Sequence, residues 1–373
     1  MSIMGHMNWS ALDTSHMAQA LALAEQALFI TTPNPRVGCV IVSATGQVLG
    51  QGHTQAAGLA HAEIMALRDA QALGHEVKDA TAYVTLEPCA HQGRTGPCCD
   101  ALVAAGVARV VVSVQDPNPQ VAGLGFARMR AAGIQVDVGL GEQEATELNI
   151  GFFKRMLQAR PWVRMKTAQS LDGQTALLNG QSQWITGEAA RLDGHHWRAR
   201  ACALLTGIGT VLQDNPLLDV RMVATPRQPP LVVVDSQWQT PLNAALWGPQ
   251  RPVWVYGAQA NANAREALGQ RGAHTSLLAN PSGKVDLAAL LADLGQRGIN
   301  ELHIEAGHKL NGSWLREGLV DELLLYLAPC LIGPGQGMAQ LPTLESLEAA
   351  IRLRWVDTTP FGDDLRLMAR VLR

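Results

Sequence analysis

The sequence is poor in charged and in aromatic residues, and neither charge sign is in surplus. Charged residues make up 16% of its 373 residues, aromatic residues 5%, and 29 basic residues stand against 32 acidic ones. Average soluble domains carry about 25% charged residues, and nucleic-acid-binding proteins show a basic surplus or a Lys/Arg-rich run. The charge balance therefore argues against nucleic acid as a partner, and the 47% hydrophobic content excludes a disordered chain. We expect small molecules as partners.

Long apolar runs are missing as well. No stretch reaches the ~18 residues that a membrane-spanning helix needs. The N-terminus also lacks the charged and then apolar segments of a secretory signal. We therefore expect no membrane association and a cytoplasmic protein, and we leave Met1–Met7 out of the fold argument as a poorly ordered leader.

The six cysteines indicate metal or redox chemistry, or plain burial, rather than a disulfide framework. Four of them (Cys39, Cys89, Cys98 and Cys99) fall in the first hundred residues, whereas eight of the nine tryptophans lie at Trp162 or later. This shift, together with the chain length, predicts two domains, 1–150 and 151–373.

Hydrophobic periodicity predicts an α/β fold for both domains. In the first domain we expect helices over 15–30, 62–73, 98–105 and 127–132, and strands over 37–42, 48–50, 81–86, 109–114 and 134–138. This alternation predicts a three-layer α/β/α sheet. In the second domain we expect helices over 187–199 and 310–317, and strands over 162–168, 203–206, 231–234, 252–256, 301–305 and 322–331.

One group of residues in the first domain has the pattern of a catalytic zinc site. His61 opens a predicted helix, Cys89 follows a predicted strand, and Cys98 opens a second helix after Pro97. A catalytic zinc takes three protein ligands and keeps its fourth position for water, so one imidazole and two thiolates complete such a site. Pro97 suits the first helical position, and a cysteine at a helix N-terminus lies where the dipole favours the thiolate.

Glu63, two residues after His61, is the expected acid/base. A zinc-bound water has a pKa near ~7. A neighbouring carboxylate can carry a proton from that water to a departing amine, as in the His-x-Glu and Pro-Cys-x-x-Cys signature of zinc deaminases. The second half of the signature differs here, because eight residues rather than two separate Cys89 from Cys98.

Each of these residues alone is better explained as part of a core, and only the combination predicts a metal site. Cys99 could replace Cys98 as a ligand. Adjacent helical residues diverge by ~100°, however, so only one of the two can face the metal, and we assign Cys98. Cys39, in the middle of a strand, is expected in the core.

Longer motifs extend over nearly the whole chain. They are Thr32–Gly38, His61–Glu63, Leu86–Cys98, Ser170–Gly173, Ser182–Thr186, Asp214–Pro216, Val234–Ser236 and Glu305–Gly307. On these segments the chain resembles the bifunctional deaminase/reductase family of riboflavin biosynthesis, in which the longer insert between the cysteines is a family feature. The chain departs from the commonest form at Ala90 and Gly96, neither of which supplies a ligand.

This resemblance implies a cytidine-deaminase-like first domain and a second domain similar to dihydrofolate reductase. The first would use Zn²⁺ to deaminate 2,5-diamino-6-(5-phosphoribosylamino)pyrimidin-4(3H)-one to 5-amino-6-(5-phosphoribosylamino)uracil. The second would use NADPH to reduce the ribosyl group to ribityl. We also expect a homo-oligomer.

The resemblance further implies three sets of binding residues. The deaminase substrate would contact Asn34, His53, His91 and Arg94. The reductase substrate would contact Ser182, Arg198, Leu218, Arg221 and Glu305. NADPH would contact Ala168, Trp184, Thr210, Asp214, Ser236, Gly307, His308, Lys309, Leu310, Asn311, Gly312 and Ser313.

Without the resemblance, the residues of the second domain give a weaker indication of function, because the domain lacks the Gly-x-Gly-x-x-Gly of a Rossmann dinucleotide site. The run 307–313 follows a strand and opens a helix, whose free N–H groups suit a pyrophosphate, but a plain strand-to-helix turn has the same pattern. Arg198 and Arg221 suit a phosphate, although Arg198 could equally be an exposed helix charge. Trp184 could be core, and Asp172 could polarise the sugar or simply form a turn.

Two rival functions follow from the same motifs. A deaminase acting on flipped nucleic-acid bases needs a basic, aromatic-studded face, which the first domain does not provide. A lone deaminase, with a C-terminal domain that only binds nucleotide or holds an oligomer together, stays open. NADPH oxidation with the deaminated substrate would separate it from a bifunctional enzyme.

Overall fold

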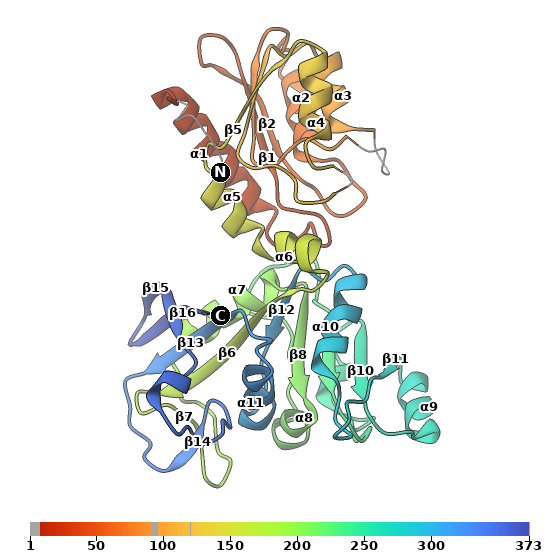
Figure 1. The fold of residues 1–373 in the computed structure, drawn as a ribbon, viewed down its shortest axis with the longest axis vertical. Coiled ribbons are helices and arrows are strands. Elements are labelled where there is room, and N and C mark those ends of the chain that lie inside the picture. Colours follow the sequence, from red (N-terminus) through yellow and green to blue (C-terminus); the bar gives the residue numbers. More distant parts are fainter. Residues whose placement is uncertain (1–7, 91–95, 120, 373) are drawn as a thin grey trace. The chain divides into compact units, whose positions relative to one another are not determined.

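The computed structural model describes residues 8–90, 96–119 and 121–372, and the chain divides into two compact units, Met1–Gln158 and Ala159–Arg373 (Figure 1). The division falls after the boundary near residue 150 that the composition suggested. The reason lies in helix α6 (Ile150–Gln158), whose Phe152 is buried in the core of unit 1.

Unit 1 contains a five-stranded sheet in the order β2-β1-β3-β4-β5. Strand β1 runs antiparallel to both β2 and β3, while β3, β4 and β5 are parallel. The strands are β1 (Gly38–Val42), β2 (Val48–His53), β3 (Thr81–Val84), β4 (Arg109–Val112) and β5 (Gln135–Val138).

Helices cover both faces of this sheet, as Figure 1 shows. They are α1 (Ala11–Gln26), α2 (Ala62–Ala72), α3 (Cys98–Ala104), α4 (Leu124–Ala131) and α5 (Glu142–Leu148). Alternate residues of β1 pack on opposite faces, because Val40 joins a core cluster with Met17 of α1 whereas Ile41 joins one with Ala66 of α2. The expected three-layer α/β/α architecture is therefore confirmed.

Close helix-to-sheet approach explains two of the glycines in unit 1. A Cβ at Gly38 would lie 1.9 Å from the carbonyl oxygen of Ala20, and one at Gly50 would lie 2.3 Å from that of Ala66. A side chain at either position would push α1 or α2 off the sheet. Gly38 therefore fixes the height of α1, and Gly50 fixes that of α2, which carries His61 and Glu63 at its N-terminal end.

Unit 2 contains a nine-stranded sheet in the order β11-β10-β9-β8-β12-β6-β13-β16-β15. In this order, the first seven strands, which end with β13, are parallel to one another. Strand β16 is antiparallel to β13, and β15 is antiparallel to β16. They are β6 (Trp162–Ser170), β8 (Ala203–Gly207), β9 (Leu231–Val234), β10 (Val253–Gly257), β11 (Ala273–Leu277), β12 (Glu301–Ile304), β13 (Glu322–Ala328), β15 (Leu353–Phe361) and β16 (Asp364–Val371).

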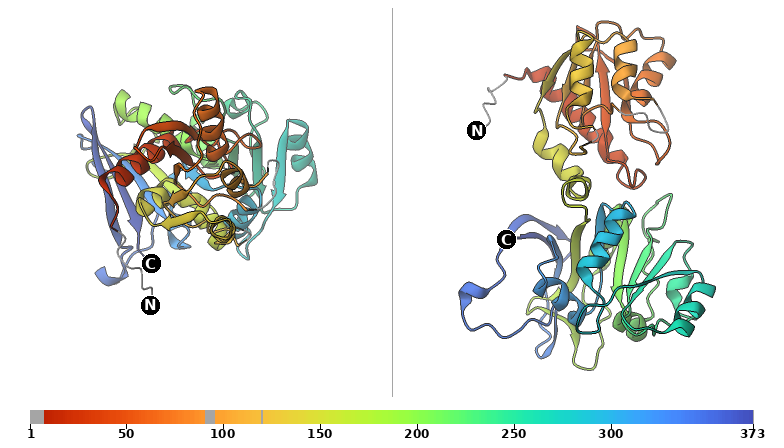
Figure 2. Two further views of the ribbon diagram at one scale, coloured as in Figure 1. Left: turned by 90° about the horizontal axis from the view of Figure 1, so that it is seen from above. Right: turned by 45° about the vertical axis from the view of Figure 1, so that its right-hand side comes forward.

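Helices cover this second sheet too, with α10 and α11 visible in front of it in the right-hand view of Figure 2. The helices are α7 (Glu188–Arg200), α8 (Ile208–Asp214), α9 (Ala262–Gln270), α10 (Leu287–Gln296) and α11 (His308–Arg316), with short 3₁₀ turns at Ala245–Trp247 and Leu347–Ala349. A small ribbon pairs β7 (Gln174–Leu177) with β14 (Gly335–Gly337). Among the described residues, no helix has both the length and the apolar character to cross a membrane.

Candidate active sites

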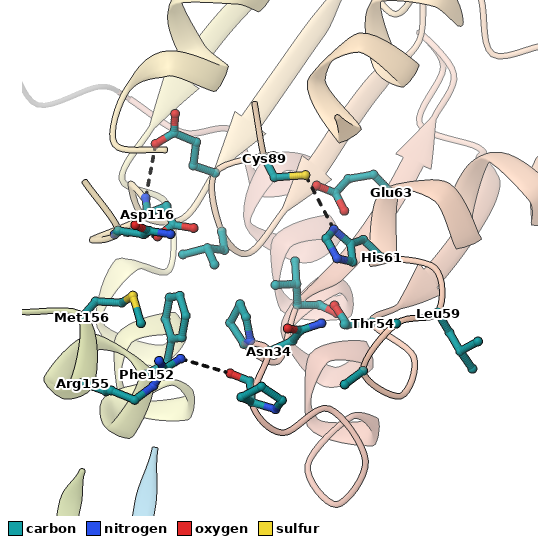
Figure 3. Close-up of a pocket in the computed structure, with 18 residues that line it drawn as sticks. Asn34, Thr54, Leu59, His61, Glu63, Cys89, Asp116, Phe152, Arg155 and Met156 are labelled. Carbon is teal, nitrogen blue, oxygen red and sulfur yellow. Dashed lines mark hydrogen bonds between the residues drawn. The ribbon is translucent and has the colours of Figure 1, made fainter. Parts of the chain in front are cut away.

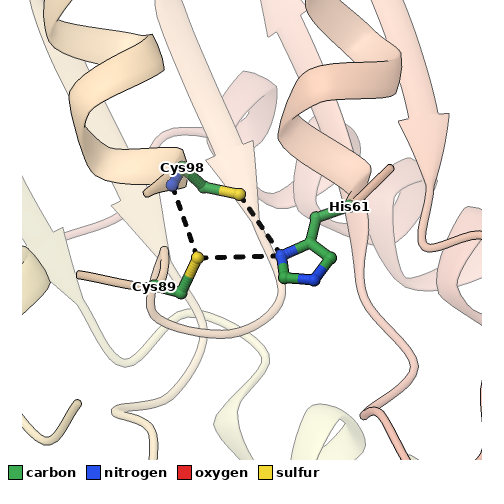
Figure 4. A group of neighbouring side chains, drawn as sticks. All are labelled: His61, Cys89 and Cys98. Carbon is green, nitrogen blue, oxygen red and sulfur yellow. Dashed lines mark hydrogen bonds between the residues drawn. The ribbon is translucent and has the colours of Figure 1, made fainter. Parts of the chain in front are cut away.

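His61, Cys89 and Cys98 lie together in unit 1, with their ligand atoms all within 4.8 Å of one another (Figure 4). The Nδ1 atom of His61 is 3.4 Å from the Sγ of Cys98 and 3.7 Å from that of Cys89. A tetrahedral zinc with bonds of about 2.0 and 2.3 Å holds an imidazole nitrogen and a sulfur about 3.5 Å apart. The spacing and the donor types both fit zinc.

The chain brings these three side chains together at helix starts and beyond a strand end. His61 is the N-cap of α2 and Cys98 is the first residue of α3, so Pro97 lies one position before the helical site expected for it. Strand β3 ends at Val84, earlier than expected, which leaves Cys89 in the loop that follows.

The first turn of α3 stabilises a thiolate at Cys89. The Cys98 backbone N–H donates a hydrogen bond to the Cys89 Sγ at 3.4 Å. Hydrogen bonding from the Cys98 thiol, supported by this N–H and by His61, lowers the pKa of Cys89 to about 4. The ligand form of this cysteine is therefore present at neutral pH.

Glu63 lies in the first turn of α2 and is only 3% exposed. Burial, together with the charge of Cys89, raises the pKa of its carboxyl group to about 7. A carboxyl group with a pKa near the working pH can both accept and return a proton.

Glu63 and two of the predicted ligands, His61 and Cys89, face a cavity of about 510 Å³ (Figure 3). Asn34 also lines this cavity, whereas His53 is not among its described lining residues. His91 and Arg94 lie outside the described residues. The wall formed by α6 contributes Phe152, Arg155 and Met156.

The lining residues that escaped the sequence analysis include the polar side chains of Glu87, Asp116 and Asn118. The Glu87 carboxylate accepts hydrogen bonds from the backbone N–H groups of Gly123 at 2.9 Å and Gly125 at 3.0 Å. It thereby ties down the loop that carries Asp116 and Asn118. Their position directly after β4, beside the carboxyl end of β3, was the signal available in the sequence.

The remaining cysteines of unit 1 are core residues. Cys99 and Cys39 are both fully buried and pack in the same hydrophobic cluster. Cys99 lies beside Cys98 in the chain, but its side chain belongs to the core rather than to the group around His61.

Unit 2 has its own cavity of about 620 Å³, lined by residues that follow the carboxyl ends of β8 and β12 and by part of β6. The predicted residues that line it are Ala168, Ser182, Trp184, Arg198, Thr210, Asp214, Leu218, Arg221, Glu305, Gly307, His308 and Asn311. The predicted residues outside its described lining are Ser236, Lys309, Leu310, Gly312 and Ser313.

The run 307–313 splits in this way because it forms a helix. Gly307 is the N-cap of α11, and consecutive helical residues turn by ~100°, so only some of them face the cavity. Asn311 does, and its Oδ1 atom is buried without a hydrogen-bond partner. The free N–H groups of this helix N-terminus fit the phosphates of a dinucleotide such as NADPH. The Asn311 Oδ1 is an acceptor, so it suits a donor group of the ligand rather than a phosphate.

Paired charges dominate the second cavity. Arg198 donates to both oxygens of Glu305, from Nε at 2.5 Å and from Nη2 at 2.8 Å, and therefore is not an exposed helix charge. Lys166, which the sequence analysis missed in mid-strand, lies 3.8 Å from the same carboxylate, and burial lowers its pKa. Arg221 lies at the rim and pairs with Asp219 at 2.6 Å.

Two alternatives from the sequence are resolved by position. Trp184 is 66% exposed and has the Arg191 guanidinium 4.7 Å from its ring centre, so the alternative that it is a core residue is wrong. Asp172 accepts hydrogen bonds from the N–H groups of Ile332 and Gly333 and is not among the described residues lining the cavity. Its position agrees with the turn interpretation.

Fold and sites together define the class: a zinc deaminase unit joined to an α/β reductase unit. Residues 10–114 match the family model described as the cytidine and deoxycytidylate deaminase zinc-binding region, and residues 161–367 match that of the RibD C-terminal domain. The chain belongs to the RibD family of riboflavin-biosynthesis proteins.

Relatives match along nearly their full length. The riboflavin biosynthesis protein RibD of Escherichia coli is 46% identical over 369 residues, covering 95% of this chain and 98% of the relative. That of Haemophilus influenzae is 42% identical, covering 97% and 98%. The solved structure of Acinetobacter baumannii RibD superposes with a TM-score of 0.87 at 42% identity, covering 97% of this chain and 99% of that one.

A second solved structure is that of a protein named for both activities. It is a diaminohydroxyphosphoribosylaminopyrimidine deaminase/5-amino-6-(5-phosphoribosylamino)uracil reductase from Thermotoga maritima, with a TM-score of 0.87 at 29% identity, covering 97% of this chain and 99% of that one. The present protein is thus a deaminase and an NADPH-dependent reductase of riboflavin biosynthesis, with Zn²⁺ and NADPH as cofactors.

Proposed function

We propose that unit 1 deaminates 2,5-diamino-6-(5-phosphoribosylamino)pyrimidin-4(3H)-one and that unit 2 reduces the ribosyl group of the product to ribityl with NADPH. The observation that carries this proposal is the group His61, Cys89 and Cys98, which lies beside the buried Glu63 at one cavity, while unit 2 has a cavity of its own. The name of the Thermotoga maritima protein gives a diaminohydroxyphosphoribosylaminopyrimidine and 5-amino-6-(5-phosphoribosylamino)uracil as the substrates of that protein.

In unit 1, His61, Cys89 and Cys98 would hold the metal. A bound zinc would lower the pKa of the attacking water to near ~7. The buried Glu63 carboxyl group, with a pKa of about 7, is suited to accept a proton from the attacking water and to return it to the departing amine. Asn34 offers an amide donor and acceptor to the pyrimidine edge, and His53, His91 and Arg94 complete the substrate contacts that the family resemblance implies.

In unit 2, positioning matters more than any reactive side chain, because the hydride comes from the cofactor. The N-terminus of α11, with Gly307 and His308, would hold the NADPH phosphates, and Asn311 would contact the cofactor beside them. The remaining cofactor contacts are Ala168, Trp184, Thr210, Asp214, Ser236, Lys309, Leu310, Gly312 and Ser313, of which the last five act from outside the described cavity lining.

The substrate of unit 2 lies against Ser182, Leu218 and the charged groups. Glu305 occupies the guanidinium fork of Arg198, which leaves Arg221 at the rim as the better placed phosphate partner. The Arg198–Glu305 pair holds the floor of the substrate site in a fixed arrangement.

We also propose that the enzyme works in the cytoplasm, where NADPH is available, and that it forms homo-oligomers. The edge strand β15 supports assembly, because Trp355 is 60% exposed and Val356 44% exposed on an edge that no described strand pairs. Light scattering measures the molar mass of the native protein and of Trp355→Glu, whose added charge on β15 should weaken the assembly. A monomeric native chain would contradict it.

A coupled assay tests the two-site proposal. The zinc-loaded enzyme receives the diaminopyrimidinone phosphate and NADPH, and ammonia release and NADPH absorbance are followed together. We expect both signals, and we expect Glu63→Ala to lose ammonia release but still to reduce supplied deaminated substrate. Ammonia without NADPH oxidation would favour the lone deaminase with a non-catalytic second unit, and no ammonia would contradict the substrate.

A further inference from the structure

The deaminase substrate carries a phosphate, and its cavity has few groups that could receive one. The described charged residues that line this cavity, apart from His61, are Glu63, Glu87, Asp116 and Arg155. Arg155 is the one lysine or arginine among the described lining residues, and Arg94 lies outside the described chain.

Arg155 lies on the wall of the cavity made by α6, across from the group around His61, as Figure 3 shows. Phe152, Arg155 and Met156 have the spacing i, i+3 and i+4, which puts them on one face of the helix. The guanidinium lies 6.0 Å from the Phe152 ring centre, and its Nη2 donates to the Pro33 carbonyl at a long 3.5 Å. The side chain is half-buried.

The backbone that carries Arg155 is tied to the rest of the cavity wall. Asn149, between α5 and α6, accepts from the Arg36 backbone N–H at 2.7 Å and donates to the Arg36 carbonyl at 2.8 Å. The Arg36 guanidinium donates to the Leu148 carbonyl at 2.7 Å. These bonds join α6 to the loop of Asn34, and the buried Phe152 anchors the same helix in the core. Arg155 is therefore preorganised.

The charged side chains differ between the two sides of the cavity. Glu63 lies beside the metal ligands and repels a phosphate there, whereas Arg155 places a positive charge on the wall made by α6, across the cavity from His61. Building on the proposed function, we infer that Arg155 binds the 5-phosphate of the deaminase substrate and so turns the amino-bearing carbon of the pyrimidine toward the metal ligands. It is a specificity-determining residue for phosphorylated substrates.

The test compares two substrates in the full-length, zinc-loaded enzyme: the phosphorylated pyrimidine and the same compound without its phosphate. Arg155→Gln should lower kcat/KM for the phosphorylated substrate about 10- to 100-fold, mostly through KM, because a charge-assisted hydrogen bond is lost. The variant should match the native enzyme on the dephosphorylated compound. Arg155→Lys should restore part of the loss, since it keeps the charge without the fork.

Arg68→Gln is the matched control, because Arg68 is an exposed arginine of α2 that does not line the cavity. It should behave like the native enzyme on both substrates. Zinc content and reductase activity report folding of each variant. If Arg155→Gln fails to fold, Arg155→Lys serves as the test variant. It should lose part of its kcat/KM for the phosphorylated substrate and none for the dephosphorylated compound.

The outcomes separate this inference from the proposed function. A native enzyme that releases no ammonia contradicts the proposed substrate itself. A native enzyme that deaminates, with Arg155→Gln equally active on the phosphorylated substrate or equally impaired on both substrates, overturns the role of Arg155 and leaves the proposed function standing.

Discussion

The two cavities of this protein are built in different ways. In unit 1, a few side chains at helix starts and in one loop provide the chemistry, and Glu63 follows a ligand by two residues. In unit 2, the charged side chains are already paired with one another, as in Arg198 and Glu305, and helix α11 presents its N-terminus. A substitution in unit 1 should therefore remove a reaction step, whereas one in unit 2 should disturb position and stability.

The largest expected effect is the loss of the metal. Cys98→Ser should abolish zinc retention and lower ammonia release at least ~10³-fold, because activation of the attacking water is worth several kcal/mol. Reduction of supplied deaminated substrate should stay within about twofold of native. Metal analysis beside both assays measures this. Cys99→Ala, in the core, is the matched control, and the assignment fails if that variant loses zinc while Cys98→Ser keeps it.

The paired charges of unit 2 should give the next largest effect. Glu305→Gln strips the Arg198 guanidinium of a partner in a largely buried setting, and we expect a loss of about 3 kcal/mol in unfolding free energy. NADPH oxidation should fall while ammonia release persists. Arg297→Gln breaks an exposed pair with Asp293 and should cost under about 1 kcal/mol. Urea unfolding measures the free energy of unfolding of both variants. Equal losses would contradict the expected difference between a buried and an exposed ion pair.

A smaller effect is expected from pH, and the pKa of His195 fixes its sign: the free energy of unfolding of unit 2 should fall as the pH falls. Burial, followed by the charges of Arg198 and Arg221, lowers the pKa of His195 to about 4, below the ~6.5 of an unfolded histidine. The unfolded chain then binds more protons between these values, so stability falls as pH drops from about 6.5 to 4, by about 1 to 2 kcal/mol.

Tryptophan fluorescence during urea unfolding follows this change, because eight of the nine tryptophans lie at Trp162 or later. His195→Asn should flatten the dependence between pH 7 and pH 5. An unchanged slope in that variant would assign the pH dependence to other groups.

The smallest expected effect concerns an exposed aromatic residue. Trp184→Ala should cost under about 1 kcal/mol, since the side chain is 66% exposed and only its contact with Arg191 is lost. Trp314→Ala, at 0% exposure, should cost about 3 to 5 kcal/mol. Thermal unfolding of both variants compares the two, and a larger loss at Trp184 would place it in a core after all.

How far sequence reasoning reached depends on how local each signal is. The α/β class and the strands around the two sites were predicted, because β1, β3, β4 and β9 are buried and strongly apolar. The hairpin of β15 and β16 was missed. Most of the Leu353–Phe361 strand is exposed, so it lacks the alternation of a half-buried strand.

The same distinction holds for the sites. The grouping of His61, Glu63, Cys89 and Cys98 could be predicted because each lies at a helix start or after a strand, where the chain pattern carries meaning. Arg155 and Lys166 could not, since each is a single charged residue whose relation to the cavity depends on which strands and helices pack together. Of the run 307–313, only Gly307, His308 and Asn311 are among the described cavity lining, because a helix turns its other residues away.

One mixing experiment tests the two-site account most directly. Glu63→Gln and Glu305→Gln are each supplied with the diaminopyrimidinone phosphate and NADPH, separately and together, while NADPH oxidation is followed. The account predicts little oxidation by either variant alone and clear recovery in the mixture, because one variant supplies the deaminated product that the other reduces. A mixture no more active than its separate components, with each variant active on its own half-reaction, would contradict two independent sites.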